Sequence, residues 1–205
     1  MSRAADVLAV HAIKAASDYD IVRGDFDDAL FEAFWGYVAL GGGRSSINAG
    51  RQAVAYAVPA AFEAGYAEAG GDAAEMEPED SDWATAKQAE QLDYVVDSFE
   101  ALKPTRGEAD EDAVGLRVGA WLSMLDGVYS EGKLRGDRNK MLTFDGDDGK
   151  ESCAECKRYK GERHSAAWWL KRDLVRRNGN DNFGCGRWEN CFHNLFDDDG
   201  EEYTA

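Results

Sequence analysis

Apolar residues recur at helical spacing through most of the first 131 residues of the chain. The pattern is interrupted where polar residues and glycines gather, at 17–20, at Gly41-Gly42-Gly43 and at 70–80. Between these breaks the spacing predicts helices over 2–16, 25–40, 46–69, 81–103 and 110–131. The sequence therefore predicts a mainly α fold, with a helical body over 1–139 and a loop or linker at about 70–80.

Two features refine this body. Pro59 stands inside the third predicted helix and predicts a kink there, because proline lacks the amide hydrogen that the helix needs. The segment from Asp72 to Asp80 is acidic and contains Pro78, a composition typical of an exposed loop.

After Gly132 the pattern changes. Residues 141–144 form a short apolar strand candidate, and residues 166–171 have the pattern of a short helix. We therefore expect a small α+β module over 140–196. The chain ends in an acidic tail over 197–205, and a block of like charge of this kind is expected to be disordered unless a partner orders it.

All four cysteines and two of the three histidines fall inside this module. Cys153 and Cys156 have the C-x-x-C spacing that can present two thiolates to one ion from a single turn, and Cys185 and Cys191 supply a looser second pair. Together they predict one structural zinc ion in a zinc-knuckle-like module. His193 follows Cys191 by two residues and can replace Cys185 or Cys191 as a ligand, so the sequence leaves the choice between four cysteines and three cysteines with one histidine open.

The histidines and cysteines can also serve roles without a metal. His164 precedes the short helix, where a knuckle often delivers a ligand, but it can equally be a solvated or packed imidazole. His11 lies far from any cysteine and is not a candidate. The cysteines can also form two disulfides or stay free, although disulfides need an oxidising compartment and the chain opens with no basic, apolar signal sequence.

Charge is distributed unevenly. The chain has 40 acidic and 23 basic residues, a formal charge of −17, which argues against a surface that binds nucleic acid throughout. From 150 to 196, by contrast, ten basic residues face six acidic ones. Solvated charges near the thiolates explain this basic module, and a docking face for nucleic acid or an acidic partner is the alternative. No apolar run has the length of a membrane span, so we expect a soluble protein.

The aromatic residues of the module predict its core. Trp168, Trp169, Phe183 and Trp188 supply bulk that a small module needs, although they could instead stack on bases beside the arginines. None of the predicted helix faces collects paired carboxylates or a Ser, His and Asp set, so we expect no enzyme activity.

Several motifs follow one another in the module in a particular order. They are Cys153-x-x-Cys156, Lys160-Gly161, His164-Ser165, Trp168-Trp169, Asn180-x-Asn182-Phe183 and Cys185-Gly186-x-Trp188-x-x-Cys191-x-His193. This order resembles the C-terminal module of the tailed-phage head morphogenesis (MuF-like) minor capsid proteins. The helical segments 49–65, 92–99 and 117–129 also resemble the body of that family. Tyr159 stands where the family usually has leucine, and His193 stands where many members have cysteine, which leaves the ligand set open.

The resemblance implies a virion structural protein, a minor capsid component at or near the portal or the head-to-tail junction. Its partners would be portal or capsid proteins, and it would be assembled in the host cytoplasm. The basic module could contact packaged DNA. Two other interpretations are a zinc-dependent nuclease or DNA-processing protein, in which His164 or His193 activates water, and a cellular zinc-binding protein-interaction module.

Overall fold

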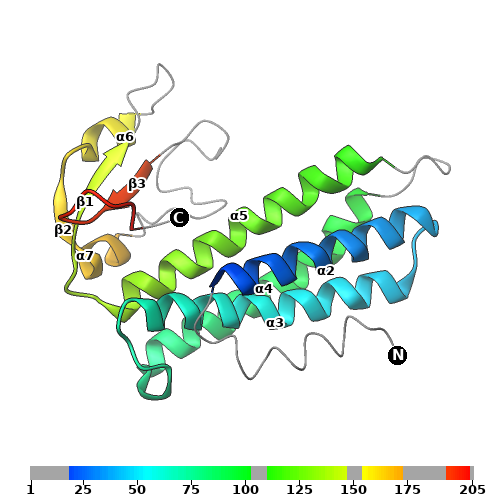
Figure 1. The fold of residues 1–205 in the computed structure, drawn as a ribbon, viewed down its shortest axis with the longest axis horizontal. Helices are drawn as coiled ribbons and strands as arrows, with labels where there is room; N and C mark the ends of the chain where they lie inside the picture. Colours follow the sequence, from blue (N-terminus) through cyan, green and yellow to red (C-terminus); the bar gives the residue numbers. More distant parts are fainter. Residues whose placement is uncertain (1–18, 103–109, 147–153, 173–192, 204–205) are drawn as a thin grey trace.

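The structure is a computed structural model that describes residues 19–102, 110–146, 154–172 and 193–203. Within these residues, four long helices form the body, with a small sheet at one end (Figure 1). They are α2 (Tyr19–Ala39), α3 (Arg44–Glu68), α4 (Pro78–Ala101) and α5 (Glu111–Gly136), and the short helix η1 (Ala73–Glu75) precedes α4. The sheet module comprises β1 (Met141–Gly146), α6 (Ala154–Tyr159), β2 (Arg163–Ser165), α7 (Ala166–Lys171) and β3 (His193–Phe196). The expectation of a mainly helical chain with a small α+β module is confirmed.

Glycines allow α3 and α5 to cross in close contact. A Cβ atom at Gly65 of α3 would overlap the backbone carbonyl of Tyr129, and one at Gly132 of α5 would overlap that of Phe62. Gly136 makes the same kind of contact one turn further on. Because backbone meets backbone here, the α3–α5 pair is the centre of the body, and α2 and α4 lie on opposite sides of it (Figure 1).

Aromatic side chains fill the space between these helices. Phe34 of α2 and Phe99 of α4 lie with their ring centroids 4.5 Å apart, and Phe26 meets Trp121 of α5 edge to face at 6.4 Å. Phe99 also covers Gly50 of α3, where a Cβ atom would overlap its ring. Burial of these large apolar surfaces provides the main stabilisation of the body.

Pro59 lies inside α3, and a side chain from α4 compensates for it. Proline cannot donate to the carbonyl four residues earlier, which here is that of Ala55. The side-chain Nε2 of Gln88 donates a hydrogen bond to this carbonyl at 2.6 Å. Gln88 therefore satisfies the acceptor that Pro59 leaves without a partner, and α3 continues to Glu68. The kink expected at Pro59 stays a prediction.

This contact predicts an energetic coupling between the two residues. Gln88→Ala is expected to lower the free energy of unfolding by about 1–2 kcal/mol, because it leaves a partly buried carbonyl unpaired. In a Pro59→Ala background, where residue 59 regains its amide donor, Gln88→Ala should lower the free energy of unfolding clearly less. Urea denaturation of the four variants in a double-mutant cycle measures the difference. Gln52→Ala, at an exposed position of α3, is the control, and equal costs of Gln88→Ala in both backgrounds would contradict the coupling.

Three predicted helix boundaries were wrong. Helix α2 begins at Tyr19 rather than near Asp25, although residues 17–20 are polar. Tyr19 stacks on Tyr129 of α5 at 4.0 Å and its hydroxyl donates to Asp126 at 2.6 Å. These contacts with a helix more than a hundred residues away stabilise the first turn of α2. The helix predicted over 2–16 lies outside the described residues.

The other two errors concern the ends of α4 and α5. Helix α4 begins at Pro78 rather than Ser81, with the proline in its first turn, and α5 continues to Gly136 rather than ending near Glu131. The expected linker at 70–80 therefore includes η1 and the first turn of α4. Asp80, expected in an exposed loop, is fully buried.

The sheet is antiparallel, with β1 between β2 and β3. Its buried core consists of Leu134, Leu142, Phe144, Ala166, Trp169 and Leu195. Leu134 belongs to α5, so the apolar core of the module extends onto the last turns of the body. The boundary expected between 139 and 140 falls between α5 and β1, but the two parts share packing across it.

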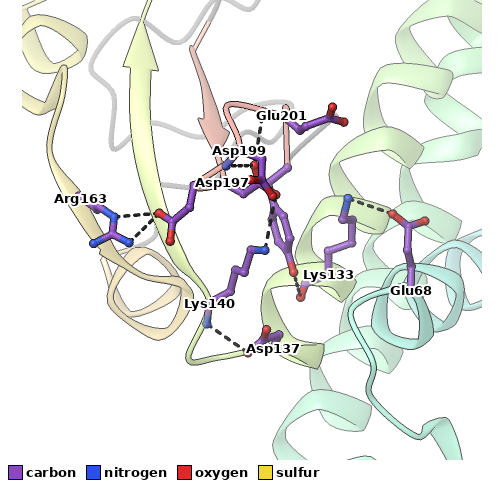
Figure 2. Close-up of polar contacts among 10 residues, drawn as sticks. Glu68, Lys133, Asp137, Lys140, Arg163, Asp197, Asp199 and Glu201 are labelled. Carbon is purple, nitrogen blue, oxygen red and sulfur yellow. Dashed lines mark hydrogen bonds and ion pairs between the residues drawn. The ribbon is translucent and has the colours of Figure 1, made fainter.

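The acidic tail was expected to be disordered, and for residues 197–203 this was wrong. Asp197 accepts hydrogen bonds from the amides of Asp199 and Glu201, both at 3.0 Å, and closes a turn (Figure 2). The amide of Tyr203 then donates to the carbonyl of Leu195 at 2.7 Å. The ring of Tyr203 lies against Lys133, 4.5 Å from its Nζ, and burial raises the pKa of Tyr203 to about 12.

Basic residues explain why the tail folds back. Lys140 Nζ lies 3.5 Å from a carboxylate oxygen of Asp197, and Arg163 binds Asp198 at 2.6 Å (Figure 2). These opposite charges offset the repulsion that the block of acidic residues would otherwise experience. The tail is thereby attached to both β2 and the segment that follows α5.

Candidate functional site

The predicted zinc ligands are only partly described. Cys153, Cys185 and Cys191 lie outside the described residues. Cys156 belongs to α6 and His193 opens β3, and for both the backbone position alone is described. His164 belongs to β2 and is described with its side chain.

The strand register separates the two histidines. His164 pairs with Leu142 of β1, whereas His193 pairs with Gly146 on the opposite side of that strand. Four residues along a strand span about 13 Å, and crossing two strand spacings adds about 10 Å, so the backbones lie about 16 Å apart. A histidine side chain and its zinc–nitrogen bond of about 2 Å together reach roughly 6–7 Å from the backbone, so two imidazoles cannot meet at one ion across about 16 Å. A single zinc site can therefore use at most one of them.

Of the two histidines, His193 lies at the end of the sheet where β1 ends. Its partner Gly146 is the last residue of β1, and α6, which carries Cys156, lies beside this end of the strand (Figure 1). His164 pairs further back along β1. The backbone arrangement leaves either histidine, but not both, as a possible partner of Cys156 at one ion.

His164 has other partners. Its ring stacks on that of Trp168 at 3.6 Å, and its Nε2 lies 3.0 Å from a carboxylate oxygen of Glu162. The guanidinium of Arg172 lies 3.6 Å from the centroid of the same tryptophan. Because the imidazole of His164 and the guanidinium of Arg172 both lie 3.6 Å from the Trp168 ring, they must occupy opposite faces of the indole. These contacts account for His164 as a packed side chain of the module.

The aromatic residues of the module are used for packing. Trp169 is fully buried and its Nε1 donates to the carbonyl of Leu142 at 3.3 Å. Both faces of Trp168 are covered, so its ring is not free to stack on a base. The prediction that these two tryptophans form core is confirmed for Trp169 and holds in part for the half-buried Trp168, whereas Phe183 and Trp188 lie outside the described residues.

In the described part of the chain, no three His, Cys, Asp or Glu side chains are grouped so that they could hold a metal ion. Most of the predicted ligands lie outside that part. The zinc site and its ligand set therefore stay a prediction, restricted by the sheet register to one histidine at most.

A second cluster of chemically active side chains was missed by the sequence reasoning. Asp80 and Glu131 are both fully buried, and both bind Arg135 of α5, at 2.7 and 2.8 Å. Arg138 binds the same oxygen of Asp80 at 2.6 Å, and the ring of Trp83 covers the Arg135 guanidinium at 5.2 Å. Two buried carboxylates thus balance two guanidinium groups, that of Arg135 mostly buried and that of Arg138 partly exposed.

The two carboxylates affect the titration of Arg135. Burial alone would lower the pKa of Arg135, but the carboxylates of Glu131 and Asp80 outweigh it and raise that pKa above its ordinary value. The i,i+4 spacing of Glu131 and Arg135 is a signal in the sequence. Nothing in the local sequence connects either residue to Asp80, which lies more than fifty residues earlier.

This cluster lies at the joint between body and module. The backbone carbonyl of Arg138 accepts a hydrogen bond from Ala167 at 3.0 Å, and that of Lys140 accepts one from Ala166 at 2.8 Å. Asp80 therefore holds the same segment of chain that supports the start of α7. The arrangement fixes the module relative to α4 and α5, and its paired charges suit support rather than catalysis.

A smaller polar cluster lies beside it. Lys133 binds the carboxylate of Glu68 at 3.0 Å (Figure 2). The hydroxyl of Tyr129 binds the same carboxylate. Burial would raise the pKa of Glu68, but these two hydrogen bonds hold it below its ordinary value. The Tyr203 hydroxyl donates to the carbonyl of Lys133 at 3.4 Å. The C-terminal turn is thus connected to α3 through α5.

Comparison with known protein families, with characterised proteins and with solved structures finds no match to this chain. Within the described ranges, no helix is both long and apolar enough to cross a membrane. Function is therefore inferred from the chain's own residues.

Proposed function

We propose that this chain is a structural protein of a tailed-phage virion, a minor capsid or head morphogenesis component acting at or near the portal or the head-to-tail junction. The observation that carries the proposal is the order and spacing of the cysteine and histidine motifs between Cys153 and His193, which resembles the C-terminal module of that family. The same proposal places the mature protein in the virion and its assembly in the host cytoplasm.

The fold suits a scaffold with two connected parts. A long helical body offers extended surfaces for portal or capsid subunits, and the buried Asp80 cluster joins the module to it without a flexible linker. A docked body would therefore hold the module at a set position. This connection supports a positioning role in an assembly.

One zinc ion would stabilise the module. Cys153 and Cys156 would hold it together with two of Cys185, Cys191 and His193, and a site closed by four protein ligands is structural. The described apolar core of the module is small, and a metal supplies the folding free energy that such a core lacks.

Any contact of the module with packaged DNA would rely on its positive charge and not on stacking of aromatic rings on bases. Lys157, Lys160 and Lys171 are exposed on the module, whereas the aromatic rings beside them are buried or covered. The strongly acidic body would be repelled by DNA. Any such contact would therefore be made by lysines to phosphates and would weaken steeply with salt.

Metal analysis of the purified protein tests the zinc site. Protein prepared under reducing conditions is expected to carry about one zinc per chain, and a Cys153→Ser, Cys156→Ser variant is expected to lose it. The matched variants are His193→Asn and His164→Asn. Because His164 already stacks on Trp168 and bonds to Glu162, His164→Asn should keep the metal. Absence of metal from the wild type, or its loss in His164→Asn, would contradict this site.

Two further assays separate the functional alternatives. Co-purification with a portal protein expressed from the same virus is expected for the virion role and not for a cellular interaction module. Metal-dependent cleavage of DNA would instead support the nuclease interpretation, in which an open metal position activates water.

A further inference from the structure

A cavity lies between α4 and α5. Each of these helices packs closely on α3, and side chains rather than close backbones span the space between them. The cavity has a volume of about 220 Å³, and it is lined by Glu90, Gln91, Tyr94, Arg117, Ala120, Trp121 and Met124. Trp121 is fixed there because its Nε1 donates to the hydroxyl of Ser98 at 3.2 Å. A cavity this small holds one apolar side chain rather than a cofactor.

Exposed apolar side chains flank the cavity. Leu116 is 79% exposed, and it directly precedes Arg117 and lies one turn before Ala120, both of which line the cavity. Tyr94, on the opposite wall, is 52% exposed. Gly115 and Gly119 beside Leu116 present no side chain, and a Cβ atom at either would meet nothing within 4 Å. A protruding leucine thus stands next to a hollow on one face of the body.

This face also carries charges of both signs. Arg117 is partly buried, yet no carboxylate in the described part of the chain lies within ion-pair distance of it. The other partly buried cations of the body, such as Arg23 and Lys133, each have one. Glu90 stands across the cavity and is mostly exposed, although it pairs with Lys87. Tryptophan, tyrosine and arginine are the residue types that contribute most to protein interfaces.

We propose that this face binds a second copy of the chain in a two-fold arrangement. Leu116 of each subunit would enter the cavity of the other, and Arg117 would face Glu90 of the partner subunit. In a two-fold interface the same surface of both subunits meets, so that surface must carry both a protrusion and the hollow that receives it. Here the protrusion is Leu116, and the cavity wall at Ala120 lies one turn further along α5, about 5 Å away. With a two-fold axis between Leu116 and the cavity, the two leucines fill both cavities at once. A different partner would need only the hollow and would leave the exposed leucine unexplained.

Sedimentation equilibrium of the purified chain tests the proposal, which does not depend on the virion role. The wild type is expected to form a reversible dimer that tightens as salt is added, because salt screens the repulsion between two chains of charge −17. Leu116→Asp should weaken dimerisation on the order of thirtyfold, the effect of losing a central contact. Leu40→Asp is the matched control, since Leu40 is 76% exposed but lies at the end of α2, outside the cavity lining.

A charge exchange tests the geometry itself. Arg117→Glu and Glu90→Arg should each weaken the dimer, and the double variant should recover much of the lost affinity, because each exchanged pair again has opposite signs. Circular dichroism verifies that every variant is folded. A wild type that stays monomeric at all concentrations and salt levels would overturn the proposal. So would equal effects of Leu116→Asp and Leu40→Asp, or no recovery in the double variant.

Discussion

Gly65→Ala and Gly132→Ala are each expected to destabilise the protein by about 3 kcal/mol, the upper end of the range for overpacked interiors. Each new methyl group would meet a backbone carbonyl of the facing helix, which cannot turn aside as a side chain can. Alanine favours a helix over glycine by only about 1 kcal/mol, so the steric cost dominates. To relieve the overlap α3 and α5 must separate, and the packing of α2 and α4 on that pair would loosen with them.

Chemical denaturation followed by circular dichroism measures this effect. Gly24→Ala is the matched control, because Gly24 lies inside α2 and a Cβ atom there meets nothing within 4 Å. It should stabilise the protein by roughly 0.5–1 kcal/mol through helix propensity. If Gly65→Ala behaved like Gly24→Ala, the close crossing of α3 and α5 would be wrong.

Asp80→Asn is expected to lower the free energy of unfolding by about 3–4 kcal/mol, the cost of breaking a buried ion pair by removing one partner. Arg135 would keep Glu131, but Arg138 would lose its carboxylate, and the cluster would carry a net positive charge beside the buried residue 80. The change preserves the shape of the side chain, so the loss reports on charge.

The same variant tests whether the cluster supports the module. The amides of Ala166 and Ala167 bond to the carbonyls of Lys140 and Arg138, and their protection from hydrogen exchange should fall in Asp80→Asn. Asp82→Asn, an exposed position in the first turns of α4, should leave both stability and protection unchanged. Equal behaviour of the two variants would show that Asp80 does not hold the joint.

The helical body was predictable because helical periodicity is a local property. The apolar spacing indicated α2, α3, α4 and α5, and the glycines at 41–43 and 70–71 indicated two of their ends. The starts of α2 and α4 were missed for a physical reason. Tyr19 and Asp80 lie in polar segments, and the groups that hold them there, Asp126 and Arg135, come from α5.

For the candidate site, the sequence predicts the cysteine ligands but not which histidines can reach the same ion. The cysteine spacing alone predicts a metal site, since two thiolates from one turn can hold one ion, and this site stays a prediction. Whether His164 and His193 could serve the same ion depends on strand register, and register is set by pairing with β1, which neither histidine adjoins in sequence. The acidic tail was misjudged because Lys140 and Arg163, which neutralise it, are also distant along the chain.

The sequence by itself determined the class of the fold, the division into an acidic helical body and a basic cysteine-containing module, and the residues that a zinc ion would require. Only the tertiary structure decided where the helices end, which charges are buried together and that His164 and His193 pair with distant residues of β1. It also decided that Leu116 stands beside a cavity. Periodicity and spacing depend on neighbours along the chain, whereas burial and charge pairing depend on neighbours in space, which the packing of α3 against α5 brings together.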